Sequence, residues 1–225
     1  MKIIEPSFEI LTEINGDKIL KNLERAGRTC YKSESNITDE SAKKFISSII
    51  KSGHFTILEH FSVSVKIICD RGILTELSRH RLCSLSVEST RFCDYTKDKF
   101  KSQITCIEPF FWECNDPDCI SGNRMCMNCK KYQIWENTMT YIEDKYIELI
   151  EFGATAQEAR SILPNSLKTE IIMTANLREW RHIFNLRAIG TTGKPHPQML
   201  EIMIPMLSRF KELIPVVFDD LICEI

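Results

Sequence analysis

Three guanidinium groups and one imidazole lie close together in a single segment of the chain. Residues 79–92 read Arg-His-Arg-Leu-Cys-Ser-Leu-Ser-Val-Glu-Ser-Thr-Arg-Phe. Arginine presents a planar fork of donors that matches the oxygens of a phosphate or a carboxylate, and hydroxyl groups add further hydrogen bonds. The segment is therefore typical of an anion-binding site. A solvated basic helix end is the alternative interpretation, because charge clusters usually face water.

A second group of chemically active residues lies in the last third of the chain. Residues 176–188 read Asn-Leu-Arg-Glu-Trp-Arg-His-Ile-Phe-Asn-Leu-Arg-Ala. On a helix, Arg178, His182 and, less directly, Asn185 fall about one turn apart on one face. For His182 alone, a structural histidine would be the better interpretation. Its combination with Arg178 instead favours a contact to a ligand.

The chain has ten cysteines, and six of them stand singly in or beside apolar segments, which fits reducing surroundings. These six are Cys30, Cys69, Cys83, Cys93, Cys106 and Cys223. The other four cluster in a loop, as Cys114, Cys119, Cys126 and Cys129. Four thiolates close in sequence are able to hold a structural zinc ion, but the first pair is more widely spaced than in most zinc sites. A zinc site and free loop thiols both remain open, and neither is expected to act in catalysis.

The overall composition is that of an ordinary globular protein. The 225 residues are 43% hydrophobic and 27% charged, with a formal net charge of −2. This length favours one domain, 1–225, with a cysteine-rich insertion at about 112–130. The charge gives no general attraction to nucleic acids or anionic membranes. Because residues 1–6 contain no long apolar run and no stretch is long enough to span a membrane, we expect a cytoplasmic protein.

Hydrophobic spacing predicts the elements that must position these residues. We expect helices over 17–27, over 38–51 with Thr38 or Asp39 as cap, and over 132–152 with Gly153 at the end. His196 and Pro197 are expected to open the last helix, in which Pro205 suggests a kink.

Alternating apolar residues predict strands over 2–12, 61–67 and 167–175. A turn at 70–72 is expected to lead into a helix that ends at Arg81, so the anion-binding segment would lie at a helix end and in the following loop. Thr155 with Glu158, and Asn176 with Glu179, are typical of helix capping pairs. The irregular order of helices and strands favours an α+β fold over a doubly wound sheet.

The anion-binding segment resembles the signature of the flavin-dependent thymidylate synthases, Arg-His-Arg-x-x-Ser-x-Asn-x-x-Ser-x-Arg-Tyr. Ser86 stands in place of the Asn, and Phe92 lacks the Tyr hydroxyl but keeps the aromatic ring. Residues 53–60, 159–164 and 176–188 are similar to the same family. The similarity thus covers most of the chain outside the cysteine loop.

The resemblance implies a reaction, a fold and an assembly. The reaction is the reductive methylation of dUMP to dTMP, with 5,10-methylenetetrahydrofolate as carbon donor, FAD as hydride carrier and NADPH as reductant. The fold is a twisted, mostly antiparallel sheet flanked by helices. The assembly is a homotetramer with sites at the subunit boundaries. Nucleic acid and membrane partners are not expected, on the ground of the net charge given above.

The resemblance also implies roles for individual residues. Ser89, Arg91 and Arg160 match positions at the nucleotide phosphate, and Arg187 matches an arginine beside the uracil ring. Ser89 is expected to position the substrate rather than attack it, because no adjacent base is assured. His54 matches a histidine involved in folate and nicotinamide handling, with a charge partner for a helix end as the alternative. Other positions around the nucleotide are Glu76, Val87 and Glu88.

The family's FAD positions map to nine residues of this chain. They are Thr56, Glu59, Arg79, His80, Arg81, Leu82, Asn176, Arg178 and His182. Asn176 has a second interpretation as a simple helix cap.

Two other functions remain as alternatives. The arginine-rich segments with a zinc knuckle would suit a nucleic-acid-binding or regulatory module, although the slightly acidic charge does not favour it. A flavin reductase without methyl transfer would use many of the same residues.

Overall fold

The structure is a computed structural model, and it describes residues 1–123 and 125–223. The chain forms two compact units, each assembled from segments that are far apart in the sequence. Unit 1 contains Met1–Ser7, Ile68–Leu77 and Val87–Ile171, and unit 2 contains Phe8–Ile67, Ser78–Ser86 and Ile172–Ile225. The expectation of a single domain stays a prediction.

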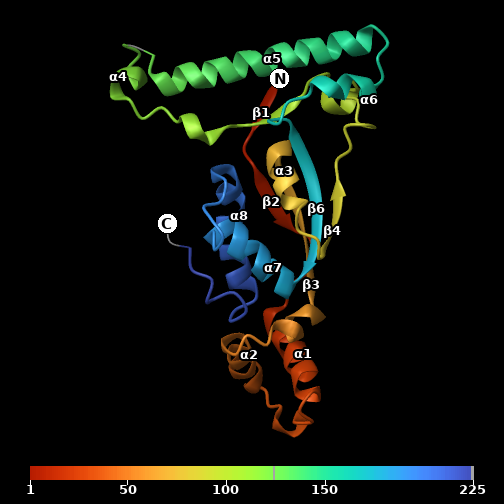
Figure 1. The fold of residues 1–225 in the computed structure, drawn as a ribbon, viewed down its shortest axis with the longest axis vertical. Coiled ribbons are helices and arrows are strands. Elements are labelled where there is room, and N and C mark those ends of the chain that lie inside the picture. The colour runs from red at the N-terminus through yellow and green to blue at the C-terminus, as the bar shows by residue number, and fades with distance from the viewer. Residues whose placement is uncertain (124, 224–225) are drawn as a thin grey trace. The chain divides into compact units, whose positions relative to one another are not determined.

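A four-stranded sheet forms the framework that carries most of the candidate residues (Figure 1). Its strand order is β2-β3-β6-β4, where β2 is Ser7–Ile10, β3 is Ser62–Asp70, β6 is Lys168–Asn176 and β4 is Cys83–Val87. The hydroxyl groups of Ser64 and Thr174 bond at 2.7 Å, and the Leu177 N–H donates to the Phe61 carbonyl at 3.0 Å. Residue numbers increase along β3 while those of the paired residues in β6 decrease, so the two strands run antiparallel.

The alternation predicted for residues 61–67 is confirmed. Val63, Val65 and Ile67 are completely buried, while the residues between them are partly exposed. One face of β3 therefore lies in the core of unit 2, and the strand is held in register because a slip of one residue would expose all three side chains.

Two helices of unit 2, α1 (Gly16–Thr29) and α2 (Ser41–Lys51), pack against each other (Figure 1). The prediction for α1 is confirmed, and Asn15 caps it by accepting the Lys18 N–H at 3.0 Å. The predicted cap of α2 by Thr38 or Asp39 is wrong. The helix begins after Glu40, and the Thr38 N–H instead donates to the Ser41 hydroxyl at 2.9 Å.

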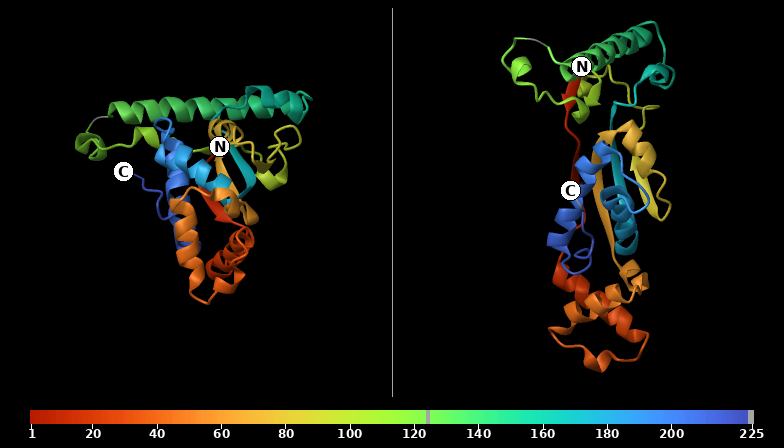
Figure 2. Two further views of the ribbon diagram at one scale, coloured as in Figure 1. Left: turned by 60° about the horizontal axis from the view of Figure 1, so that its bottom comes forward. Right: turned by 60° about the vertical axis from the view of Figure 1, so that its left-hand side comes forward.

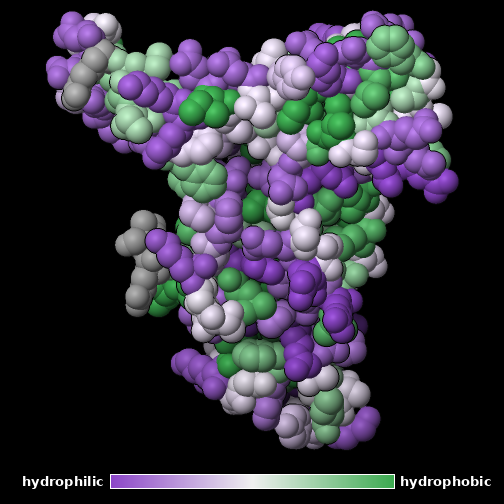
Figure 3. All heavy atoms as spheres, turned by 45° about the horizontal axis from the view of Figure 1, so that its top comes forward, coloured by the Kyte–Doolittle hydropathy of each residue, from purple (hydrophilic) through white to green (hydrophobic). Residues whose placement is uncertain are grey.

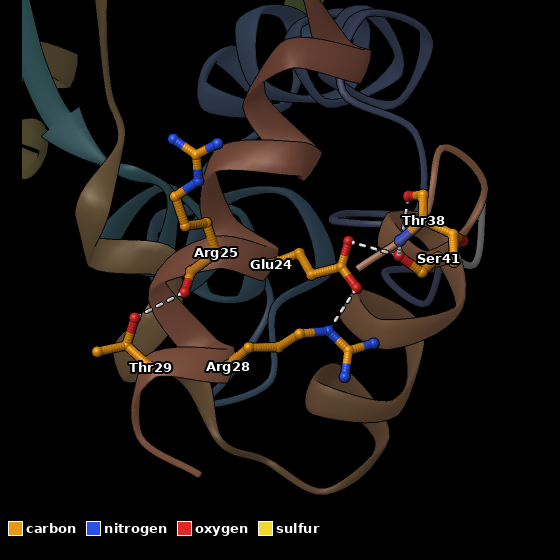
Figure 4. Close-up of polar contacts among 6 residues, drawn as sticks. All are labelled: Glu24, Arg25, Arg28, Thr29, Thr38 and Ser41. Atoms are coloured by element: carbon orange, nitrogen blue, oxygen red, sulfur yellow. Dashed lines mark hydrogen bonds and ion pairs between the residues drawn. The ribbon is translucent and has the colours of Figure 1, made fainter. Parts of the chain in front are cut away.

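A buried carboxylate connects these two helices (Figure 4). Glu24 on α1 is completely buried. One of its oxygens accepts from Arg28 Nε at 2.7 Å, and the other accepts from the Ser41 hydroxyl at 2.9 Å. Because Ser41 is the first residue of α2, this network fixes the start of α2 against α1.

The C-terminal part of unit 2 continues from β6 into α7 (Leu177–Phe184), a single π-helical turn (Asn185–Ile189) and α8 (Pro197–Leu213). The Gly190 N–H donates to the Asn185 carbonyl at 2.9 Å, which is the five-residue spacing of a π-helix. Trp180 and Phe184 on α7 pack on Phe210 of α8 with ring centroids 5.2 Å from that ring. The aromatic core thus anchors the helix that carries the second candidate group.

Unit 1 contains a parallel pair of strands, β1 (Lys2–Ile4) and β5 (Thr105–Ile107), with the helices α3 (Arg71–Leu77), α4 (Pro117–Ile120), α5 (Met127–Glu151) and α6 (Ala156–Ala159). Helices α5 and α6 lie side by side in every view (Figures 1 and 2). The core includes Trp135, Met139 and Tyr146 from the inner side of α5.

The outer side of α5 carries apolar residues as well. Ile134 is 68% exposed and Tyr141 is 62% exposed. Hydrophobic side chains accordingly interrupt the hydrophilic surface along the upper part of Figure 3, where α5 lies. A helix that shows large apolar side chains to solvent on one side is suited to contact another surface.

Two further predictions concern the ends of elements. Gly153 follows α5 with φ of +89°, a left-handed conformation that ends helices, and the Thr155 N–H donates to Glu158 at 2.7 Å in the predicted capping box. The expectation that the anion-binding segment is a helix end and a loop is wrong in part, because α3 ends at Leu77, before Arg79, and residues 83–87 form β4. The α+β fold class with an antiparallel sheet is confirmed, and none of the described helices is long and apolar enough to cross a membrane.

Replacing Arg28 should destabilise the protein strongly. In Arg28→Ala the Glu24 carboxylate would stay buried with its charge uncompensated, which lowers the free energy of unfolding by about 3 kcal/mol. Urea denaturation measures the change. The exposed Arg25→Ala on the same helix is the matched control, with an expected effect below about 0.5 kcal/mol. Equal losses in the two variants would contradict the role given to the buried network.

Candidate functional site

Ser89 and Arg91, two of the three candidates for phosphate binding, lie in unit 1 directly after β4. The Ser89 hydroxyl accepts the Arg91 N–H at 3.3 Å, and the Ser89 carbonyl accepts the N–H groups of Phe92 and Cys93 at 3.1 and 2.9 Å. These bonds fold the backbone into a tight turn. The turn therefore sets the direction in which the Arg91 side chain leaves the chain.

Arg91 reaches a neighbouring element through its guanidinium group. Its Nε–H donates to the Gln157 side-chain oxygen at 2.7 Å, and its guanidinium lies 5.2 Å from the centroid of the Phe92 ring. Gln157 is on α6, three residues before the exposed Arg160. The structure thus places Arg91 beside the segment that carries Arg160, and two exposed guanidinium groups in one region suit a phosphate.

Glu88 lies between these residues and the sheet. Its backbone N–H donates to the Glu170 carbonyl at 2.9 Å, and its carboxylate accepts from the Tyr95 hydroxyl at 3.0 Å and from Lys168 Nζ at 2.8 Å. Burial and the nearby Glu88 carboxylate raise the pKa of Tyr95, so its hydroxyl stays a donor. Of the other candidates, Glu76 is half-buried on α3 and Val87 is exposed at the end of β4.

In unit 2, three side chains form a row around a buried imidazole. Arg187 Nε–H donates to His80 Nε2 at 3.2 Å, and His80 Nδ1 lies 3.6 Å from a carboxylate oxygen of Glu179. Since Nε2 is an acceptor, the ring proton lies on Nδ1, where it faces the carboxylate. His80 is only 6% exposed, so water does not compete strongly for either nitrogen.

The charge state of this row follows from its burial. Burial, together with the charges of Arg187 and His182, lowers the pKa of His80 to about 4. Burial also raises the pKa of the Glu179 carboxyl. The imidazole is therefore neutral at neutral pH although a carboxylate faces it. Only this neutral form accepts the hydrogen bond from Arg187.

The ring of His182 stands edge-on to that of His80, with centroids 5.9 Å apart. Ligand atoms of His80, Glu179 and His182 lie within 4.8 Å of one another, which is close enough for a metal site. However, one nitrogen of His80 accepts from Arg187 and the other faces Glu179. The group is therefore arranged for hydrogen bonding.

Two more flavin candidates are paired with each other. Arg178 donates to the Glu59 carboxylate at 2.6 Å, with both side chains about half exposed. Asn176 accepts the Glu179 N–H at 2.8 Å and so caps α7. This confirms the capping interpretation of Asn176, while a cofactor contact stays a prediction. The cap also fixes Glu179 in the first turn of α7, where it faces His80.

The remaining candidates of unit 2 lie at its surface. They are His54, Thr56, Arg79, Arg81, Leu82 and His182, all of them exposed. Arg79 and Arg81 flank the buried His80, so successive side chains of this short segment point in turn to solvent, to the interior and to solvent again. A cavity of about 750 Å³ in the same unit lies between β2 and α8, and its lining includes none of the predicted site residues.

Sequence reasoning did not identify Gln157 or Lys168 as site residues, and it described Glu179 only as a capping partner. Each of them positions a residue of the motif: Gln157 holds Arg91, Lys168 holds Glu88 and Glu179 faces His80. The sequence contains only a weak signal for these three positioning residues. The capping pair with Asn176 did locate Glu179 in the first turn of a helix, but the partner across the unit is not encoded nearby in the sequence.

The four clustered cysteines also come together in unit 1. Their sulfur atoms all lie within 4.8 Å of one another.

The comparisons with known proteins agree on one family. The sequence profile described as "Thymidylate synthase complementing protein" matches residues 13–216. The chain is 30% identical over 222 residues to the flavin-dependent thymidylate synthase of Mycobacterium avium, which covers 96% of this chain and 84% of the relative. It is 29% identical over 202 residues to that of Geobacter sulfurreducens, which covers 87% of this chain and 78% of the relative.

A solved structure shares the fold. The UMP/dUMP methylase PolB from Streptomyces cacaoi, bound with 5-Br UMP, has a TM-score of 0.75 to this chain at 17% sequence identity. The likeness covers 97% of this chain and 95% of the other.

The buried imidazole should make stability depend on pH. Its folded pKa of about 4 lies below the ordinary value of 6.5, so the unfolded chain binds more protons in that range. Stability is then fully present above about pH 6.5 and falls by up to about 3 kcal/mol as the pH drops toward 4. In His80→Gln this contribution should be absent, as measured by denaturation at several pH values. His60→Gln, at an exposed histidine, should keep the wild-type profile, and an unchanged slope in His80→Gln would refute the assignment.

Proposed function

Because the chain belongs to the thymidylate synthase complementing protein family, the family of the flavin-dependent thymidylate synthases, we propose that it is an enzyme that methylates dUMP to dTMP. In this proposal 5,10-methylenetetrahydrofolate donates the carbon, and NADPH supplies the reducing equivalents through FAD. The finer parts of the proposal, namely the donor, the reductant and the assembly, are supported by the resemblance of the motifs.

The observation that supports this function best is the hydrogen bond between Arg187 and His80. The two residues belong to the two motif blocks that resemble the family, and they lie 107 positions apart in the sequence. A solvated basic helix end would not bury its histidine against an arginine from another block. The bond supports a shared site in which the blocks act together.

In the proposed reaction the nucleotide is held by its phosphate and by its base. Arg91 and Arg160 would bind the phosphate as bidentate donors, with Ser89 completing the set. Arg187, fixed by His80, would lie against a pyrimidine, and in a tetramer with sites at its subunit boundaries the two groups of residues do not have to come from the same chain. A fixed cation there stabilises the negative charge that develops on the ring when its carbon becomes nucleophilic.

The residues of unit 2 fit a flavin dinucleotide in their chemistry. Arg79 and Arg81 are exposed cations beside the buried His80, and the Glu59 carboxylate holds the guanidinium of Arg178. Exposed guanidinium groups suit a pyrophosphate, and Leu82, which is 75% exposed, offers an apolar contact. When bound, the flavin supplies hydride transfer. The chain's own contribution is to bind the dinucleotide and to keep His80 neutral beside it.

A homotetramer forms part of the same proposal. Leu82 and Phe92 are 75% and 77% exposed, and both stand within the motif that resembles the family. Large apolar side chains at such positions are suited to burial against a further subunit. His54, assigned to folate and nicotinamide by the resemblance, is exposed three residues after α2, so in this proposal it is accessible to both ligands.

The activity itself is directly testable. We expect the purified protein to be yellow and to form dTMP from dUMP when methylenetetrahydrofolate and NADPH are added, with each omission abolishing the product. Light scattering should give the mass of four chains. Oxidation of NADPH without any dTMP would indicate a flavin reductase instead, and salt-sensitive binding of polynucleotides without turnover would indicate a nucleic-acid-binding module.

Arg91→Ala should raise the KM for dUMP by about 10- to 100-fold, with a smaller change in kcat, because a charge-assisted contact to the phosphate is lost. Gln157→Ala should raise the same KM by a smaller factor, since it only positions Arg91. Steady-state kinetics measure both. Lys99→Ala removes an exposed cation of the same unit and serves as control, with the wild-type KM expected. A wild-type KM in Arg91→Ala would remove this residue from the phosphate site.

A further inference from the structure

The loop that precedes α5 gathers four thiol groups at one point. Cys119 Sγ and Cys129 Sγ are 3.5 Å apart, Cys114 Sγ and Cys126 Sγ are 3.8 Å apart, and all four sulfur atoms lie within 4.8 Å of one another. Zinc–sulfur bonds of about 2.3 Å in a tetrahedral site place the sulfur atoms about 3.8 Å from one another. The two shortest distances thus match the edges of a tetrahedron around one ion, and the limit of 4.8 Å keeps all four sulfur atoms within reach of the same point.

The same distances are too long for disulfide bonds, in which the sulfur atoms are about 2.05 Å apart. The other six cysteines are also unpaired in the structure. A four-sulfur cluster of this kind is typical of zinc or of iron, because soft thiolates select these metals.

Backbone donors surround the sulfur atoms. The Cys126 N–H donates to Cys119 Sγ at 3.3 Å, and the Cys129 N–H donates to Cys126 Sγ at 3.4 Å. Cys126 is also the N-cap residue of α5, so the cluster lies at the positive end of a long helix. Both effects stabilise negative charge on sulfur, as the backbone around a metal-bound thiolate does.

The loop has no apolar core that would order it otherwise. None of the described residues between 110 and 134 is buried. Trp112 at the start of the loop packs against the core of unit 1, but Ile120 is 71% exposed and Met127 is 65% exposed, so these two side chains lie in solvent. A segment that buries so little apolar surface depends on a cross-link to hold one conformation.

We propose that Cys114, Cys119, Cys126 and Cys129 bind one Zn²⁺ ion as a closed structural site. The four thiolates occupy all positions of a tetrahedral ion, so none remains for water or substrate, and the ion takes no part in methyl transfer. Its role is to fix the loop and α4 to the start of α5. The site lies within unit 1 and does not depend on the proposed reaction.

Metal analysis of the purified protein tests this proposal. Mass spectrometry of the metals should give about one zinc ion per chain in the wild type. The zinc content of Cys119→Ser and of Cys129→Ser should be lower by a factor of about ten or more. Cys223→Ser, at a cysteine outside the cluster, is the matched control and should keep its zinc. Iron in place of zinc, or full zinc content in both cluster variants, would overturn the assignment.

Two measurements on the wild-type chain test for the zinc site even if the cysteine variants do not fold. Replacement of the metal by Co²⁺ should produce the intense visible bands of a tetrahedral all-thiolate site, at longer wavelengths than flavin absorption. Treatment with a strong chelator should expose residues 112–130 to limited proteolysis while the flavin spectrum is unchanged.

Thiol titration of the denatured, unreduced protein distinguishes the alternatives. Ten reactive thiols together with bound zinc are expected. Ten thiols without any metal would mean free loop cysteines, and about six thiols without metal would mean two disulfides in the cluster. Either result would overturn the proposal.

Discussion

The hydrogen bond from Arg187 to the imidazole of His80 forms only while that imidazole is neutral, and the imidazole stays neutral because it is buried away from water. In water the ring would often be protonated near neutral pH, and a protonated ring has no lone pair to offer. Burial keeps His80 neutral, and the capped first turn of α7 brings Glu179 to its other nitrogen. The orientation of Arg187 thus follows from where the fold places one uncharged ring.

The fold combines this buried row with cations that are left at the surface. The surface cations lie on both sides of the short strand β4 in the sequence. Arg79 and Arg81 come before the strand, and Arg91 comes after it. The net charge of the whole chain is only −2, so these local cations attract anions without making the protein generally basic. Carboxylates and amides, such as Glu59 and Gln157, hold individual guanidinium groups in place.

The local signals in the sequence predicted the elements well where backbone chemistry dominates. The alternation in β3, the capping pairs at Thr155 and Asn176, and the glycine after α5 each depend on neighbouring residues alone. Strand β4 was not predicted, although Cys83, Leu85 and Val87 alternate with serines, because the neighbouring arginines and hydroxyl groups were interpreted as an anion-binding loop. Helix α5 begins earlier than expected because a cysteine, which is an unusual cap, starts it. The contacts of Gln157 and Glu179 join distant segments, and no pattern within either segment encodes the partner.

The π-helical turn that carries Arg187 has a consequence for variation in this region. Such a turn contains one residue more than an α-helix would accommodate over the same length, and its geometry is held by the bond between Gly190 and Asn185. Removing one residue there would restore regular winding and rotate the following side chains by roughly 100° about the helix axis. The chain is thus constrained in length over residues 185–189, because only the extra residue of the turn lets Arg187 face His80 while the connection folds back on Asn185.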